Sequence, residues 1–161
     1  MIGRAGLCVA VVLLAGCSGE RGPGTEQPSF YNSMANANAK LDAAGAASMI
    51  SGYRQNNGLG AVTIDPELMK AAAKNKLDHD VAGPFTKRLQ ASGFAAAKGV
   101  ENISAGYHTM AEAFSGWRDS PSHRANMLAS GVTKMGIAAV YAPNSKYKVF
   151  WTMILAAPDH P

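Results

Sequence analysis

Residues Trp117 to Asn126 have the sequence WRDSPSHRAN, and this stretch decides the interpretation of the second half of the chain. Ser120 followed by Pro121 is a strong helix start, because serine is a preferred N-cap and proline suits the first helical position. Before it, the capping-box pattern Thr109-Met110-Ala111-Glu112 predicts a helix that runs to about Asp119. We therefore expect two consecutive helices, the second reaching about Leu128.

His123 is the third residue of that second predicted helix. The positive end of the helix dipole disfavours imidazolium there, so the ring is expected to be neutral, the form that accepts a proton or binds a metal. Asp119 and Ser120 precede it and are expected either to cap the helix or to point into the same cleft. A purely local role, with His123 bonded to nearby backbone, remains the alternative.

The rest of the chain predicts helices before this stretch and strands after it. The order of elements does not alternate between strand and helix, so it predicts an α+β fold with helices packed on a small, mainly antiparallel sheet. Trp117 and Trp151 are expected in the core. The expected helices cover 42–57, a segment from Asp65-Pro66 onward and 85–91; the expected strands cover 99–106, 133–141 and 147–155, the last two joined by a turn at Pro143-Asn144-Ser145.

Two more side chains could belong to a site with His123. Glu101 lies in an otherwise apolar extended segment, where burying a carboxylate is costly unless it is paired. It is either a site residue or a structural ion-pair partner of Arg54 or Arg124. His79 follows the second predicted helix, and is either a site residue or a surface histidine at a helix end. His108 and His160 are expected on the surface.

The amino-terminal segment predicts export. MIGRAGLCVAVVLLAGC carries one basic residue, then an apolar run too short to span a bilayer comfortably, then Leu14-Ala15-Gly16-Cys17. This ending resembles the lipobox of bacterial lipoproteins, which implies cleavage before Cys17 and acylation of that cysteine. The predicted division is a signal peptide over 1–16, a lipid anchor and flexible tether over 17–30, and one domain over 31–161. The residue after Cys17 is Ser18 rather than the aspartate associated with inner-membrane retention. An outer-membrane location is therefore favoured in a Gram-negative cell.

Composition supports one exported domain. The chain has 161 residues, is 47% hydrophobic and carries a net charge of +4, which falls to +3 without Arg4 of the signal segment. This excess is too small and too scattered to indicate nucleic-acid binding. Both cysteines, Cys8 and Cys17, lie in the amino-terminal segment. The domain therefore has neither a disulfide nor a cysteine nucleophile.

Several segments, taken in order, resemble the bacterial members of the CAP superfamily (cysteine-rich secretory, antigen 5 and pathogenesis-related proteins, or SCP domains). The resemblance covers about 46 to 157. Its motifs are Met49-Ile50-Ser51-Gly52-Tyr53-Arg54 with Gly58-Leu59, Asp65-Pro66-Glu67-Leu68, Arg88 with Gly93-Phe94, Glu101-Asn102-Ile103, Trp117, Ser120-Pro121-Ser122-His123-Arg124-Ala125-Asn126-Met127-Leu128 and Gly136-Ile137.

This resemblance implies a three-layer α-β-α sandwich with a cleft lined by two histidines and two acids, which holds zinc or another divalent cation in some members. His123 matches the second histidine and Glu101 the first acid. His79 is the candidate for the first histidine. The second acid is replaced by Ser120, with Asp119 beside it. The implied cleft comprises His79, Glu101, Asp119, Ser120 and His123, with His79 and His123 as the metal ligands.

Three functions remain open. The first is a non-catalytic, lipid-anchored envelope module that binds a small apolar ligand, a cell-wall ligand or a partner protein. The second is a metal-dependent hydrolase of envelope peptides or peptidoglycan, which would use Glu101 and His123 for catalysis. A zinc hydrolase usually needs three protein ligands and a base, and Glu101 cannot be both. The third is a structural lipoprotein whose Glu101 and histidines serve only the fold.

Overall fold

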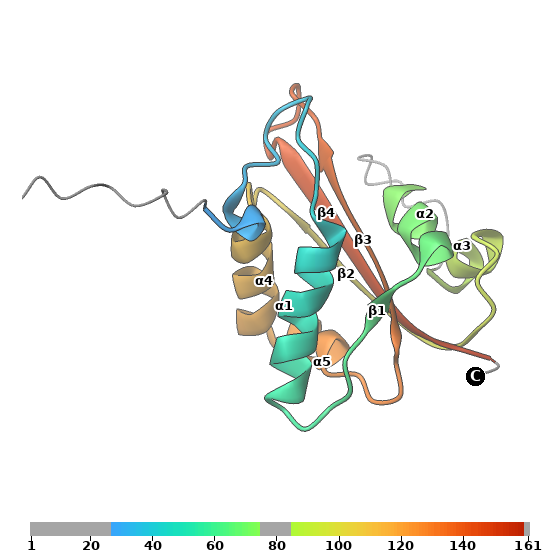
Figure 1. Ribbon diagram of the computed structural model, residues 1–161. Helices are drawn as coiled ribbons and strands as arrows, with labels where there is room; N and C mark the ends of the chain where they lie inside the picture. The colour runs from blue at the N-terminus through green and yellow to red at the C-terminus, as the bar shows by residue number, and fades with distance from the viewer. Residues whose placement is uncertain (1–26, 75–84, 160–161) are drawn as a thin grey trace, which may run out of the picture.

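The computed structural model describes residues 27–74 and 85–159 (Figure 1). Five α-helices, a short 3-10 helix and four strands make up this part of the chain. In chain order they are η1 (Ser29–Tyr31), α1 (Ala43–Gln55), β1 (Thr63–Ile64), α2 (Pro66–Lys74), α3 (Phe85–Ala91), β2 (Ala96–Ala105), α4 (Met110–Asp119), α5 (Pro121–Met127), β3 (Lys134–Tyr141) and β4 (Val149–Pro158).

Local capping explains where the helices begin. The Asp42 carboxylate accepts a hydrogen bond from the Gly45 amide at the start of α1. One oxygen of Asp65 accepts from the amides of Glu67 and Leu68 at the start of α2. Thr109 and Glu112 form the complete capping box predicted for α4. The helix starts expected from sequence are therefore confirmed.

The four strands form one mixed sheet in the order β1-β3-β4-β2. β3 and β4 make the expected antiparallel hairpin, and β2 pairs antiparallel with the other side of β4 over nearly its whole length. β1 pairs parallel with β3 through only two residues, Thr63 and Ile64. A strand this short leaves no alternating pattern, and the sequence did not predict it.

Helices cover both faces of the sheet, which confirms the three-layer α-β-α sandwich. In Figure 1, α1, α4 and α5 lie on one side and α2 and α3 on the other. Alternate residues of β4 divide between two cores accordingly. The larger core contains Ile50, Trp117, Met127, Trp151, Met153 and Leu155, and the smaller one contains Leu68, Ala72, Leu89, Phe94, Ile154 and Ala156. Both tryptophans are fully buried, as predicted.

The smaller layer packs very closely on the sheet. A Cβ atom at Gly136 of β3 would overlap the backbone of Leu68 in α2, so only glycine lets the helix approach this near. Leu68 is fully buried as a result. The Gly136-Ile137 motif thus sets the distance between α2 and the sheet.

The amino-terminal part of the described chain packs onto the domain. The Ser29 hydroxyl donates to Asp42, and Phe30 packs against the larger core. Across residues 27–74 and 85–159, no helix is long and apolar enough to cross a membrane. The predicted signal peptide and Cys17 lie outside the described residues.

Candidate functional site

Glu101 projects from β2 and is bound by Arg88 of α3. The guanidinium donates from Nη1 to Oε1 at 3.1 Å and from Nη2 to Oε2 at 2.6 Å, which makes a bidentate pair. The side chains are only 16% and 10% exposed, respectively. A charge-assisted fork of this kind, largely shielded from water, is among the stronger polar contacts available to a protein. Glu101 is thereby fixed in orientation.

Arg88 is not the partner expected from sequence, which was Arg54 or Arg124. Arg54 is 1% exposed, and it donates instead to the backbone carbonyls of Gly60, Met127, Ala129 and Val132. Burial lowers the pKa of the Arg54 guanidinium below its ordinary value, while the four carbonyls accept hydrogen bonds from four of its five N–H groups. Its role is therefore to hold chain segments together.

Arg124 also makes no ion pair with Glu101 in the described part of the chain. It is exposed on α5, a helix that packs on the other face of the sheet from α3. The expected pairings of Glu101 with Arg54 and Arg124 were thus wrong, because the choice of partner depends on which helix covers the side of β2 that Glu101 occupies.

A pair of asparagines links the segment containing Glu101 to the segment containing His123. Asn102 is fully buried, and its amide donates to the backbone carbonyl of His123 at 2.9 Å. The Asn126 amide donates both to the Asn102 side-chain oxygen at 3.0 Å and to the backbone carbonyl of Glu101 at 2.9 Å. Strand β2 and helix α5 are therefore held in a fixed position relative to each other.

The Glu101 side chain nevertheless lies on the face of β2 opposite to the one on which α5, with His123, packs. Neighbouring residues of a strand point to opposite faces, and Asn102 points toward α5 while Glu101 points toward α3. β2 lies at the end of the strand order and, among the strands that the structure describes, pairs only with β4. The two candidate residues are thus joined through the backbone of an edge strand rather than by direct side-chain contact.

Asp119 and Ser120, which precede His123, contact residues other than His123. Ser120 is the N-cap of α5, but its hydroxyl lies 3.4 Å from that of Ser122 and makes no capping bond. Asp119 forms an exposed ion pair with Arg118, whose guanidinium lowers the pKa of the Asp119 carboxyl through hydrogen bonding and charge. No hydrogen bond joins either residue to His123 within the described chain.

The expected metal pair is only partly placed. His123 is half-buried on α5, whereas His79 lies outside the described residues. Within 27–74 and 85–159, no three histidine, cysteine, aspartate or glutamate side chains are grouped closely enough to hold a metal ion. Glu101 is held by Arg88, so its oxygens suit an ion pair better than a metal shell. An imidazole such as that of His123 is a common ligand of divalent cations.

Sequence reasoning missed three polar residues that organise this region: Arg88, Asn102 and Asn126. All three lie within the motifs quoted above. Their roles were not visible because each bond spans 13 to 25 residues of sequence and depends on how α3 and α5 pack on β2. An asparagine inside an apolar strand, as at Asn102, was the available signal, because a buried amide requires partners.

Comparisons with solved structures agree with this fold. An extracellular SCP-domain protein from Bacillus anthracis matches with a TM-score of 0.57 and 22% identity, over 70% of this chain and 39% of that protein. An outer surface protein from Borrelia burgdorferi matches with a TM-score of 0.60 and 17% identity, over 70% of this chain and 90% of that protein. The CAP domain of enterococcal PrgA matches with a TM-score of 0.54 and 19% identity, over 71% of this chain and 59% of that protein.

At these identities the similarity establishes the fold alone. The matched region spans well under half the length of the Bacillus protein. A comparison with curated protein sequences finds no significant match. The sequence profile of the cysteine-rich secretory protein family (CAP), however, matches residues 47–155, which is more than half of the chain. The chain therefore belongs to the cysteine-rich secretory protein (CAP) family.

Proposed function

We propose that this protein is an exported, lipid-anchored CAP module of the bacterial cell envelope that binds a ligand or partner without turning it over. The binding region is the edge of the sheet where β2 meets α5. The observation that carries the proposal is the hydrogen-bonded pair of the buried Asn102 and the half-buried Asn126, which fixes the Glu101 segment against the His123 segment. A rigid polar framework of this kind favours selective binding.

The state of Glu101 supports binding over hydrolysis. A general base must accept a proton during the reaction, and protonation of Glu101 would disrupt its bidentate pair with Arg88. Ser120 is likewise a poor nucleophile candidate, because its hydroxyl contact in the described chain is with Ser122 rather than His123. A metal-dependent hydrolase remains the competing proposal and requires turnover that depends on Glu101.

The proposal includes a divalent cation such as zinc, which would help to bind the ligand. His123 and His79 would hold it, which leaves open positions for water or for a donor group of the bound molecule. When bound, the cation would supply a positive centre that attracts an anionic or carbonyl group. The chain's own contribution is the fixed backbone of His123, which Asn102 holds through its carbonyl oxygen.

The cell-envelope location is also part of the proposal. Its support is the predicted signal segment and the Leu14-Ala15-Gly16-Cys17 sequence. The similar Bacillus and Borrelia structures, described as "extracellular" and "outer surface" proteins, are consistent with it. In a Gram-negative cell the outer membrane is the favoured site, where the acyl chains on Cys17 would attach the protein.

A melting series tests the metal-dependent form of the proposal. The full chain carrying Cys17→Ser, which removes the acylation site, is melted with and without zinc and compared with the same chain carrying His79→Ala and His123→Ala. Binding to the folded state alone stabilises by about 2.7 kcal/mol at a hundredfold excess over Kd. We expect zinc to raise Tm only when both histidines are present. An equal rise in both chains would place the zinc elsewhere, and no rise would favour a structural role for the histidines.

An activity assay separates binding from turnover. Envelope peptides and peptidoglycan fragments are incubated with the zinc-loaded chain and with its Glu101→Gln and His123→Ala variants. The proposal predicts no cleavage by any of them. Cleavage by the parent chain that is lost in folded Glu101→Gln would establish the hydrolase instead.

A further inference from the structure

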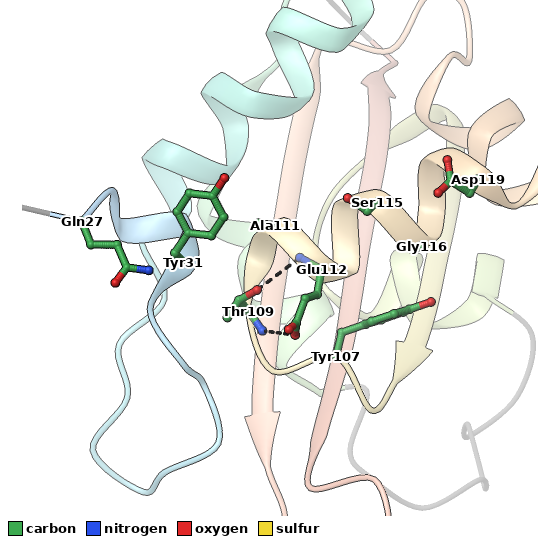
Figure 2. Close-up of a pocket in the computed structure, with 9 residues that line it drawn as sticks. All are labelled: Gln27, Tyr31, Tyr107, Thr109, Ala111, Glu112, Ser115, Gly116 and Asp119. Atoms are coloured by element: carbon green, nitrogen blue, oxygen red, sulfur yellow. Dashed lines mark hydrogen bonds between the residues drawn. The ribbon is translucent and has the colours of Figure 1, made fainter.

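A groove of about 850 Å³ lies along α4, away from Glu101 and Arg88. We call it the α4 groove, and its size falls within the range of small-molecule sites. Figure 2 shows Tyr31 and Tyr107 on either side of the first turn of α4, with Glu112 between them. The lining residues used below are Tyr31, Tyr107, Glu112, Ser115, Gly116 and Asp119.

The two tyrosines are held by the core rather than by each other. Tyr31 is 50% exposed and stacks at a tilt on Phe30, whose own ring packs against the larger core. The backbone carbonyl of Tyr107 accepts a hydrogen bond from the fully buried indole of Trp151 at 2.8 Å. These contacts place the Tyr31 ring beside Phe30 and the backbone of Tyr107 beside Trp151.

Gly116 makes room for the Tyr107 ring. A Cβ atom at this position would overlap the hydroxyl and ring carbons of Tyr107, so the ring lies directly against the helix backbone. Gly116 is an unfavourable residue for the interior of a helix. Its presence is explained by the space that Tyr107 needs.

The carboxylate between the tyrosines is also fixed. Oε2 of Glu112 accepts hydrogen bonds from the backbone amides of His108 at 2.6 Å and Thr109 at 3.0 Å. Within the described chain no hydrogen-bond donor contacts Oε1, which leaves that atom able to accept. A preorganised anion loses little conformational entropy when it binds a cation.

The charge along the groove is negative. Asp119 adds a second carboxylate at the far end of α4, and no lysine or arginine of the described chain lines the groove. Arg118 lies next to Asp119 and partly offsets it through their ion pair. Glu112 is therefore the principal charged group available to a ligand.

We propose that the α4 groove binds an organic cation, that is, a protonated or quaternary amine carried on an apolar body. Tyrosine faces attract such a cation through their quadrupole, and a carboxylate attracts it by charge. The small side chains of Ala111 and Ser115 line the helix surface between them and leave space for the apolar part of the ligand. This site is separate from the Glu101 and His123 region, and the two proposals stand or fall independently.

A titration with matched probes tests the charge requirement. The full chain carrying Cys17→Ser is labelled with ¹⁵N, and its amide shifts are followed with benzyltrimethylammonium and with neopentylbenzene, its neutral carbon analogue. We expect shifts confined to the residues around Tyr31, Tyr107 and α4, and binding of the cation at least about tenfold tighter than that of the neutral probe. Equal binding of the two probes, or shifts elsewhere, would overturn the proposal.

Further probes identify the ligand's source and test a competing class. Choline represents a quaternary amine such as a lipid headgroup carries, and cadaverine represents a primary amine such as a peptide or polyamine carries. Binding of either supports the proposal, and the tighter one indicates the source. Tighter binding of a chitin oligosaccharide, an uncharged glycan, than of either amine would contradict it.

Two variants with matched controls tie binding to the named residues. Glu112→Gln removes the charge but keeps an acceptor for the capping box, so the helix start is retained. It should weaken benzyltrimethylammonium binding by about tenfold, while Glu67→Gln on α2 should not change it. Gly116→Ala should displace the Tyr107 ring and weaken binding similarly, while Gly52→Ala, whose added Cβ meets nothing within 4 Å, should not. Unchanged binding in folded Glu112→Gln would refute the site.

Discussion

The side-chain amides of Asn102 and Asn126 are hydrogen-bonded to each other at 3.0 Å between strand β2 and helix α5. Each amide then bonds to a backbone carbonyl of the opposite segment, Asn102 to His123 and Asn126 to Glu101. The two most informative sequence motifs of the chain are thus joined by side-chain to backbone contacts that neither motif reveals alone.

Replacing Asn102 with leucine should destabilise the domain. Asn102→Leu keeps the branching and the number of side-chain heavy atoms but leaves the His123 carbonyl and one Asn126 donor without their partner. We expect a loss of about 2 kcal/mol in the free energy of unfolding, measured by urea denaturation. Asn38→Leu, on the exposed segment before α1, is the control and should change it by about 0.5 kcal/mol or less. A double-mutant cycle with Asn126→Ala should give a coupling of at least about 0.5 kcal/mol; strict additivity would contradict the network.

The ion pair between Arg88 and Glu101 should contribute more to stability than the one between Arg118 and Asp119. Arg88→Met removes the bidentate partner of a carboxylate that is only 10% exposed. We expect a loss of about 2 kcal/mol, less than the cost for a fully buried pair. Arg118→Met breaks a pair with similar geometry in open solvent and should have little effect on Tm. Equal effects of the two substitutions on stability would show that burial does not determine how much each ion pair contributes.

Arg54→Met should be the most destabilising of these substitutions. It removes donors from four backbone carbonyls at once, and the contacts to the carbonyls of Met127 and Val132 are buried, so their loss is costly. We expect about 3 kcal/mol or more by urea denaturation. Arg54→Lys should recover only part of this loss, because an ammonium cannot reproduce the planar fork. Arg124→Met, at an exposed position on α5, should have little effect; a comparable loss there would contradict this account.

Acid stability should depend on the contact between Ser29 and Asp42. The Ser29 hydroxyl and the Gly45 amide hold the pKa of the Asp42 carboxyl below its ordinary value of 3.8. Because the folded pKa lies below the unfolded one, this stabilisation is present above about pH 4 and is lost as the pH falls through the folded pKa. Ser29→Ala should therefore lower Tm near neutral pH and make Tm fall less steeply below about pH 4. Ser130→Ala should leave the profile unchanged. A parallel shift at every pH in Ser29→Ala would argue against this linkage.

Membrane attachment should depend on Cys17 alone. Cys17→Ser removes the acylation site predicted from Leu14-Ala15-Gly16-Cys17, so the exported protein should move from the membrane fraction to the soluble fraction. Fractionation followed by immunoblotting measures this. Cys8→Ser, within the apolar run, is the control and should stay with the membrane. Retention of Cys17→Ser on membranes would contradict the lipid anchor.

Features that depend on nearby residues were predictable from the sequence. The helix starts at Asp42, Asp65 and Thr109 follow from contacts within three residues, and α3 was expected with the bounds Phe85–Ala91 that it has. The hairpin of β3 and β4 also follows from local turn chemistry, although β4 extends to Pro158, further than expected. The α+β class followed from the order of the elements, whereas the three layers were implied by the resemblance to the CAP family.

Features that depend on packing between distant segments were not predictable in the same way. Arg88 and Glu101 meet because α3 crosses β2, and no sequence spacing indicates that crossing. Arg54 was a candidate ion-pair partner of Glu101, but it donates instead to backbone carbonyl groups. Every residue has such a group, so the sequence does not indicate which ones are bound. The α4 groove combines Tyr31 with Tyr107, residues from distant parts of the chain, and neither is unusual in its own segment. The position of His79 relative to His123 stays a prediction.

The four carbonyl contacts of Arg54 also determine how the region after α5 opens. The stretch from Met127 to Val132 has little regular secondary structure of its own, and such a loop would ordinarily exchange its amide hydrogens by local fluctuation. Here one side chain of α1 ties that loop to the helix, so the loop, α1 and the start of β3 should open as one cooperative unit. Amides near Val132 should then exchange as slowly as those of α1, and His123 would keep its backbone position until that whole unit unfolds.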